Sequence, residues 1–152
     1  MNAIYLYRIG NFFYRKKIPF VPTLFKILTF LVFNSVVPFS ARIGAQSRFA
    51  YGAIGVVLHS QCEIGEKVII GQGVTIGRQL DPAGVPKIGN NVYISAGARI
   101  LGDIKIGDNV IIGANSVVIA DVPDNCIAAG VPARVIRKID DDIYRMLGNI
   151  YQ

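Results

Sequence analysis

An aliphatic residue recurs at every sixth position between residues 58 and 118, with one gap at 82, and this spacing constrains the fold more than any other feature. Glycine directly follows six of these residues, and a small or aliphatic residue follows four positions after most of them. A period of six fits neither an α-helix nor an alternating strand. It is typical of a hexapeptide β-helix, in which short strands meet at tight corners. The aliphatic series is Leu58, Ile64, Ile70, Ile76, Ile88, Ile94, Ile100, Ile106, Ile112 and Val118.

The third residue after each aliphatic position supports the same fold. Type II corners need one residue with positive φ, which Gly, Asn and Asp tolerate best. All of these residues except one are Gly, Asn or Asp: Lys67, Gly73, Asn91, Gly97, Asp103, Asn109, Asn115 and Asp121. Three hexapeptides close one triangular coil, so residues 18 apart are expected to stack in columns, with coils about 4.8 Å apart.

Composition and charge restrict the class of protein. A chain of 152 residues has room for one domain with a continuous core. Cys62 and Cys126 form no metal or disulfide pattern, which favours a reducing compartment, and no signal peptide is evident, so we expect a cytoplasmic protein. Residues 1–62 carry seven Lys or Arg and no Asp or Glu, whereas residues 63–152 carry nine basic and ten acidic side chains.

The sequence predicts three regions: an N-terminal helical cap at 1–40, a β-helix at 41–138 with a protruding loop at 78–86, and a helical tail at 139–152. The run 23–33 is apolar apart from Lys26 and is shorter than the ~20 residues that span a bilayer. It either packs on the first coil or joins subunits, or else its basic flanks bring it to an anionic membrane surface at the inner face of the membrane. No nucleic-acid-binding motif accompanies the basic residues.

Counting by 18 places Val57, Thr75, Tyr93 and Ile111 in one outward column without charge. An uncharged stripe on a rigid prism is a candidate subunit interface, so the sequence predicts a homotrimer through this face.

His59, the sole histidine, follows Leu58 at a predicted corner. The same count stacks it with Gly77, and it stacks Arg78, Ala96 and Ala114 in the next column, which predicts a groove of small residues beside the loop. An imidazole titrates near neutrality and suits general-base work on a hydroxyl or amine. One histidine without clustered Cys or carboxylate ligands predicts no metal site, and neither cysteine has the pattern of an activated thiol.

The segments Ile88–Val118 and Ala128–Lys138 resemble the left-handed β-helix acyltransferases that use acetyl-CoA, closest to the serine acetyltransferase-like branch. The resemblance implies a trimer that binds acetyl-CoA in a groove between adjacent prisms. Its pantetheine arm would meet the column named above, from Gly77 and Arg78 to Ala96 and Ala114. The resemblance also supplies further candidates for the cofactor: Gly130 and Pro132 in a closing turn, and Arg134, Arg137 and Lys138 for its phosphates.

Two departures from that branch bear on the acceptor. The family's Asp-His pair is replaced by Ala50-Tyr51, and its Arg-His pair in the loop by Gly84-Val85. These departures favour an O-acetyltransferase acting on a sugar hydroxyl of a surface polysaccharide (capsule, O-antigen or exopolysaccharide). His59 would accept the hydroxyl proton, and Tyr51 and Asp81 are candidates for binding the acceptor. Tyr51 could instead be a packed aromatic residue.

Three alternatives stay open: a serine O-acetyltransferase of cysteine biosynthesis, an amino-sugar N-acetyltransferase, and a non-catalytic structural subunit.

Overall fold

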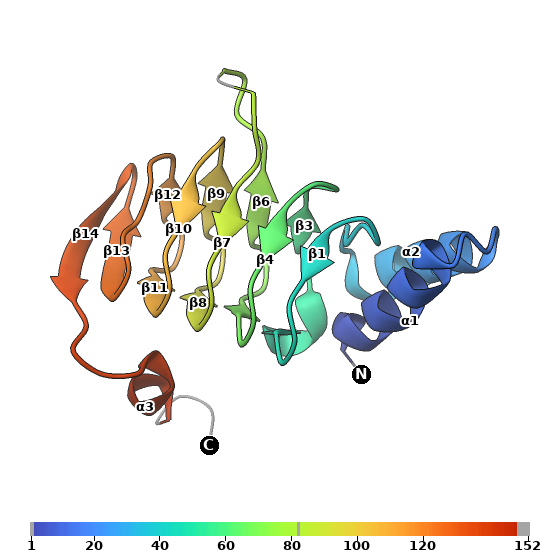
Figure 1. Cartoon of the computed structure of the whole chain (residues 1–152), viewed down its shortest axis with the longest axis horizontal. Helices are drawn as coiled ribbons and strands as arrows, with labels where there is room; N and C mark the ends of the chain where they lie inside the picture. The colour runs from blue at the N-terminus through green and yellow to red at the C-terminus, as the bar shows by residue number, and fades with distance from the viewer. Residues whose placement is uncertain (1, 82, 149–152) are drawn as a thin grey trace.

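The chain winds into a left-handed parallel β-helix of triangular cross-section, with two helices at its N-terminal end (Figure 1). The computed structural model describes residues 2–81 and 83–148. Hydrogen bonds between successive coils form three sheets, here called A, B and C. Sheet A contains β3 (Val57–Leu58), β6 (Thr75–Gly77), β9 (Arg99–Leu101) and β12 (Val117–Val118). Sheet B contains β1 (Arg42–Ile43), β4 (Glu63–Ile64), β7 (Lys87–Ile88) and β10 (Lys105–Ile106). Sheet C contains β2 (Arg48–Phe49), β5 (Ile69–Ile70), β8 (Val92–Ile94), β11 (Val110–Ile112), β13 (Cys126–Gly130) and β14 (Ala133–Lys138).

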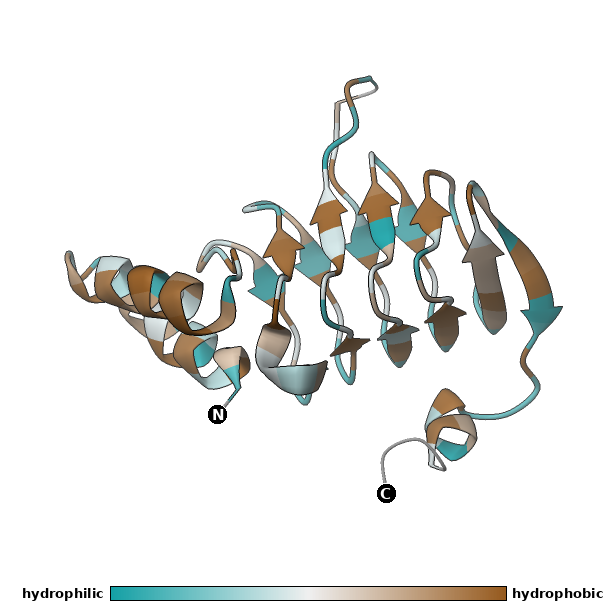
Figure 2. Ribbon diagram, turned by 180° about the vertical axis from the view of Figure 1, so that it is seen from behind, coloured by the Kyte–Doolittle hydropathy of each residue, from teal (hydrophilic) through white to brown (hydrophobic). Residues whose placement is uncertain are grey.

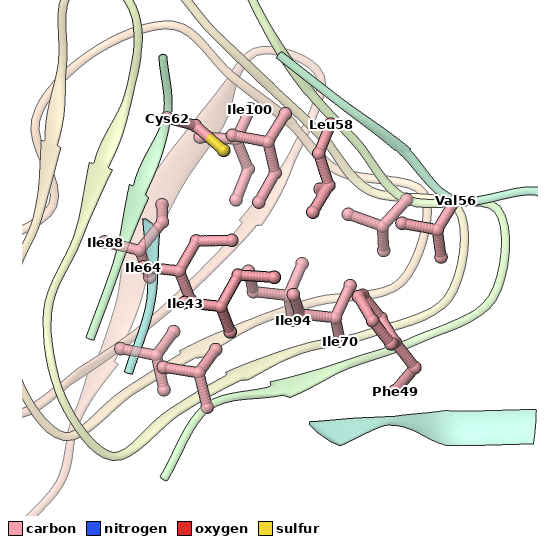
Figure 3. Close-up of a cluster of buried hydrophobic side chains, with 14 of the residues drawn as sticks. Ile43, Phe49, Val56, Leu58, Cys62, Ile64, Ile70, Ile88, Ile94 and Ile100 are labelled. Atoms are coloured by element: carbon pink, nitrogen blue, oxygen red, sulfur yellow. The ribbon is translucent and has the colours of Figure 1, made fainter. Parts of the chain in front are cut away.

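The predicted aliphatic series forms the core, because each of its members points into the prism. Figure 3 shows Ile64 and Ile88 from sheet B, Ile70 and Ile94 from sheet C, and Ile100 from sheet A converging on one apolar interior. All ten residues of the series are buried. Burying one such side chain contributes roughly 1.5–3 kcal/mol, so the stacked series is the main source of the fold's stability.

The predicted corners are confirmed at six positions and differ at two. Lys67, Gly73, Asn91, Gly97, Asn109 and Asn115 all have positive φ. Asp103 and Asp121 do not; both lie at the corner between sheets A and B, where Gly102 has a positive φ of 101° beside Asp103 and no described residue near Asp121 has a positive φ. We call this corner AB, and the others corner BC and corner CA.

The count by 18 fails across the loop at 78–86. Ile76 on β6 pairs with Ile100 on β9, which is 24 residues further on, and Ile70 pairs with Ile94 in the same way. The loop adds six residues to corner AB without adding a strand, so residues beyond it lie one sheet away from where the count puts them.

The prediction that Val57, Thr75, Tyr93 and Ile111 share one outward face is therefore wrong. Val57 and Thr75 pair on sheet A, whereas Tyr93 and Ile111 pair on sheet C. The outward apolar residues of sheet C are covered by the chain itself, since Ile139, Ile143 and Leu147 pack against Tyr93, Ile111 and Ile127.

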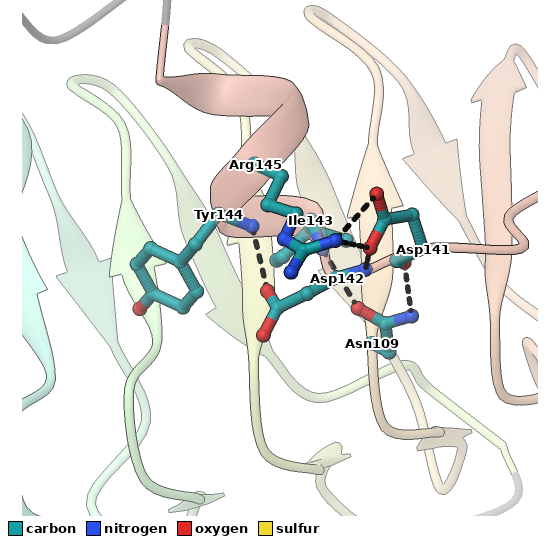
Figure 4. A network of polar contacts seen from close by, with 6 residues as sticks. All are labelled: Asn109, Asp141, Asp142, Ile143, Tyr144 and Arg145. Atoms are coloured by element: carbon teal, nitrogen blue, oxygen red, sulfur yellow. Dashed lines mark hydrogen bonds and ion pairs between the residues drawn. The ribbon is translucent and has the colours of Figure 1, made fainter.

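The segment that covers sheet C contains α3 (Ile143–Leu147) and is held by a polar network (Figure 4). Asn109 donates to the carbonyl of Asp141 at 3.0 Å and accepts from the N–H of Ile143 at 3.0 Å. Asp142 caps the helix by accepting from the N–H of Tyr144 at 2.8 Å. The last residues of the predicted helical tail, 149–152, lie outside the described residues, as does Pro82 of the predicted loop.

The N-terminal end of the prism is closed by α1 (Ala3–Arg15) and α2 (Val21–Phe33). The Tyr7 hydroxyl donates to the carbonyl of Ala41, and Asn11 donates to that of Phe39, both at 2.6 Å. Gly10 lies against the Phe39 ring, where a Cβ would come within 2.2 Å of a ring carbon. Among the described residues, no helix is long and apolar enough to cross a membrane.

Replacing Ile100 with alanine is expected to lower the free energy of unfolding by about 2–5 kcal/mol, because its side chain is fully buried among the stacked coils. Ile119→Ala is the matched control, since Ile119 is 44% exposed and its loss is expected to cost about 0.5 kcal/mol or less. Chemical denaturation of both variants measures the difference. Equal losses would show that the interior is not the main source of stability.

Candidate functional site

His59 is the first residue of corner AB after β3, and its backbone is fixed by the adjacent coil. Its N–H donates to the carbonyl of Ile76 at 2.8 Å, and its own carbonyl accepts from the N–H of Cys62 at 3.2 Å. This register confirms that His59 stacks beside Gly77. The half-buried imidazole thus lies next to the residue at which the 78–86 loop begins. The hydrogen bonds of sheet A fix the register of its coil.

The His59 imidazole accepts a hydrogen bond at Nδ1 from the N–H of Gln61, at 3.2 Å. The hydrogen bond assigns the proton of the neutral ring to Nε2, which makes Nε2 a donor in this rotamer. A general base needs a free nitrogen lone pair, so Nε2 can accept a proton only after the ring has released Gln61 and carries its own proton at Nδ1 instead. Releasing one such exposed hydrogen bond costs about 1 kcal/mol. A general base increases the reaction rate by about 10²- to 10⁴-fold, which corresponds to about 3–5 kcal/mol and exceeds this cost.

Cys62, at the same corner, is not suited to nucleophilic work. Its side chain is fully buried, and burial raises the pKa of the thiol to about 12. A thiolate is therefore scarce near neutral pH. Over residues 2–81 and 83–148, no group of His, Cys, Asp and Glu side chains could hold a metal ion.

The loop that follows β6 rises from corner AB and returns to β7 (Figure 1). At its returning end Gly84 lies against Asp103, where a Cβ on Gly84 would come within 2.3 Å of the Asp103 Cβ. Arg78 and Asp81 are exposed on this loop. Both remain accessible to a ligand at corner AB.

The predicted small residues Ala96 and Ala114 lie at corner CA, not beside His59. Ala96 follows β8 and Ala114 follows β11, and the backbone N–H of Asn115 donates to the carbonyl of Ala96 at 2.9 Å. Gly130, at the end of β13, donates its N–H to the Ser116 hydroxyl at 3.1 Å in the same corner. The predicted cofactor groove is thus divided: Gly77 and Arg78 belong to corner AB, whereas Ala96, Ala114 and Gly130 belong to corner CA. The six residues that the loop adds are the cause.

Tyr51 also lies near corner CA and is not packed in the core. It belongs to η1 (Ala50–Ala53), where Tyr51, Gly52 and Ala53 all have positive φ, and its side chain is 72% exposed. Two non-glycine residues in this region cost of order 1–3 kcal/mol each, and such strain is common at functional sites. The turn lies on the same coil as His59, and Tyr51 lines a small pocket with Arg48 and Ile69 of sheet C.

The basic residues Arg134, Arg137 and Lys138 are exposed on β14, which pairs antiparallel with β13 at the C-terminal end of the prism. Pro132 lies in the exposed turn between these two strands. These residues lie at the C-terminal end of the prism, whereas His59 follows β3, the first strand of sheet A, at the N-terminal end.

Arg99 was missed by the sequence analysis. Its guanidinium lies on the outer face of sheet A, donating to the Thr75 hydroxyl at 3.1 Å and to the carbonyl of Gly73. Counting 24 rather than 18 across the loop would have placed it beside Thr75.

A family model described as bacterial transferase hexapeptide (six repeats) matches residues 86–120. Together with the three-sided coil and its small-residue corners, this identifies the class: the chain belongs to the hexapeptide-repeat transferase family. Within that family its relatives are serine acetyltransferases. One from Synechococcus elongatus is 39% identical over 137 residues, 89% of this chain and 56% of the relative. One from Bacillus pumilus is 35% identical over 149 residues, 94% of this chain and 68% of the relative.

Solved structures agree with these relatives. The serine acetyltransferase from Brucella abortus strain S19, solved in complex with coenzyme A, matches with a TM-score of 0.84 at 33% identity, over 90% of this chain and 55% of that one. The chain therefore spans little more than half the length of several proteins that it matches. The predicted resemblance to polysaccharide O-acetyltransferases, and with it the sugar acceptor, is wrong in the light of these matches: the relatives, at 35–39% identity, are named for serine.

Proposed function

We propose that this protein is an acetyl-CoA-dependent acetyltransferase whose acceptor is the hydroxyl of serine. The observation that carries the proposal is the extent of the similarity to serine acetyltransferases, which in the Bacillus pumilus relative covers 94% of this chain and 68% of the relative. A relative solved with coenzyme A supports acetyl-CoA as the donor. We place this thioester chain along corner CA, where Ala96 is half-buried, Ala114 is exposed, and both have small side chains.

We further propose that the active site forms between two copies in a homotrimer. Corners AB and CA are the two edges of sheet A, so a trimer with sheet A facing its threefold axis brings corner AB of one copy to corner CA of the next. Sheet A is the best available face: sheet B carries Arg42, Glu63 and Lys87 outward, and sheet C is covered by α3. The outward residues of sheet A are Val57, Thr75, Arg99 and Val117.

In this arrangement His59 of one copy and Tyr51 of the neighbouring copy lie on the same coil level. His59 takes the proton from the serine hydroxyl as its oxygen forms a bond to the thioester carbonyl carbon. The carbon–sulfur bond then breaks, and the proton passes from His59 to the departing thiolate. The backbone N–H groups of Ala96 and Ala114 at corner CA are our candidates for stabilising the oxyanion, a role in which each donor is worth about 3 kcal/mol. Tyr51 then contacts the acceptor in the position of the family's histidine.

An acceptor panel tests the proposal directly. Purified protein is incubated with acetyl-CoA and either L-serine, L-threonine, glucosamine or a neutral oligosaccharide, while release of free thiol is followed. We expect serine to give the highest kcat/KM, and the product, kept at acidic pH, to retain a free amino group that reacts with ninhydrin, as an ester of serine does and an amide does not. Preference for glucosamine with an alkali-stable product would replace the proposal with N-acetylation, and no thiol release with any acceptor would remove it.

A further inference from the structure

Helix α2 carries its apolar side chains on the solvent side. Of its thirteen residues only Thr29 and Phe33 are buried, whereas Leu24 is 65% and Leu31 is 74% exposed. Thr29 satisfies its buried hydroxyl by donating to the carbonyl of Phe25 at 2.8 Å. A helix that only packed on the first coil would have the opposite arrangement, with the apolar face inward. The outer face of α2 is therefore shaped for contact with something apolar.

Four of the exposed apolar residues of α2 form one continuous stripe, and Phe30 and Val32 are exposed outside it. Leu24, Ile27, Leu28 and Leu31 follow the i, i+3, i+4, i+7 spacing, and Phe20, which is 85% exposed, extends the stripe by one turn. Figure 2 shows brown, hydrophobic colouring along both helices at this end of the molecule. Beside α2, a groove of about 730 Å³ runs past Ile27, Phe30 and Val36 toward Ser60, with Lys26 on its wall.

Cations border the stripe, and no acid offsets them. Arg15 and Lys16 are exposed at the end of α1, Arg15 lines one pocket together with Phe20, and Lys26 is exposed on α2 itself. Residues 1–62 contain no Asp or Glu. Arg8 is not part of this border, because it donates to the backbone carbonyls of Ile43 and Gly44.

A second copy of the chain is a poor occupant for this stripe. A twofold contact would bring two such faces together with their bordering cations, and residues 1–62 contain no Asp or Glu to offset either set. In the parallel trimer proposed above the three basic caps lie at one end, and the acidic run Asp140–Asp142 lies in the segment that follows β14, far from the cap (Figure 1), so this run does not offset the cations. An anionic apolar surface, in contrast, satisfies the leucines and the cations together.

We infer that α2 docks the protein on the surface of an anionic phospholipid bilayer. The helix is about 20 Å long and lies in the interface rather than crossing the ~30 Å hydrocarbon layer. Leu24, Leu31 and Phe20 enter the boundary between headgroups and acyl chains, and the cations contact lipid phosphates. The inference does not depend on the acetyl acceptor.

Vesicle co-sedimentation of the full chain tests it. We expect binding to vesicles of phosphatidylcholine with 30% phosphatidylglycerol at low salt, and at least tenfold weaker binding to phosphatidylcholine alone. Leu24→Gln with Leu31→Gln is expected to weaken binding to the anionic vesicles by at least tenfold. Arg15→Gln with Lys16→Gln is expected to weaken it about fivefold for each cation removed, and the remaining affinity should fall less steeply with salt.

Ile119→Gln with Ile136→Gln is the matched control, because these two exposed isoleucines lie away from the cap, after β12 and on β14. It should bind like the wild type. The inference is overturned if the wild type does not bind anionic vesicles, or if the α2 double variant binds as well as the control does. It is also overturned if light scattering shows that the α2 variant changes the number of chains in the assembly, since a second copy would then cover the stripe.

Discussion

Replacing His59 with alanine is expected to lower kcat/KM for acetyl transfer to serine by about 10²- to 10⁴-fold. The chain has no other histidine, and burial keeps the neighbouring Cys62 as a thiol, so neither a second imidazole nor a thiolate is available at corner AB to replace His59 as base. His59→Gln should lose activity to a similar extent, because an amide offers a hydrogen bond but cannot carry the proton. Initial rates of thiol release with serine and acetyl-CoA measure both variants.

The control for this prediction is Glu66→Ala, an exposed side chain at corner BC of the same coil, which should retain full activity. Coenzyme A binding, measured by calorimetry, should be similar in the His59 variants and the wild type, because corner CA is unchanged. The side chain of His59 makes one 3.2 Å bond to Gln61 and is only half-buried, so the thermal midpoint should hardly move. A folded His59→Ala protein with full activity would remove His59 from the mechanism.

The prism could be predicted because its determinants are local and repeated. An inward isoleucine every six residues and a Gly or Asn at the corner each depend on neighbours close in sequence, and residues such as Ile94 and Asn109 behave as their pattern requires. Lys67 also has positive φ, at 54°, although its residue type gives no such signal. At that position the coils above and below fix the corner, and the side chain adapts to it.

The candidate site could be predicted only in part, because it depends on how the coils align across the loop. His59 and Gly77 precede the irregular segment and stack as counted, whereas Ala96 and Ala114 follow it and move to corner CA. The residue types in 78–86 do not indicate whether this segment takes the place of a strand in the coil or is an insertion at a corner. The sequence did not predict that the C-terminal segment covers sheet C, because the contact of Ile143 with Tyr93 and Ile111 joins residues far apart in sequence.

The division of the site between two corners leads to a second large expected effect. A chain with His59→Ala has a defective corner AB and an intact corner CA. A chain with Ala114→Trp has the reverse, because an indole at the exposed Ala114 position fills the place proposed for the thioester chain. Each variant alone should be nearly inactive. When the two are co-expressed, one interface of every mixed trimer joins an intact corner AB to an intact corner CA.

Random mixing at equal amounts makes about three quarters of the trimers mixed, and each of these has one intact site in three, so about a quarter of wild-type activity should return. Tandem purification on two different affinity tags isolates the mixed trimers, in which about a third of wild-type activity is expected. Mixing separately purified trimers that do not exchange subunits is the control and should restore nothing. If both corners served one site within a single chain, every site would contain a defect, and verified mixed trimers would stay inactive. Recovered activity therefore distinguishes a site shared between copies from one built within a chain, whichever hydroxyl accepts the acetyl group.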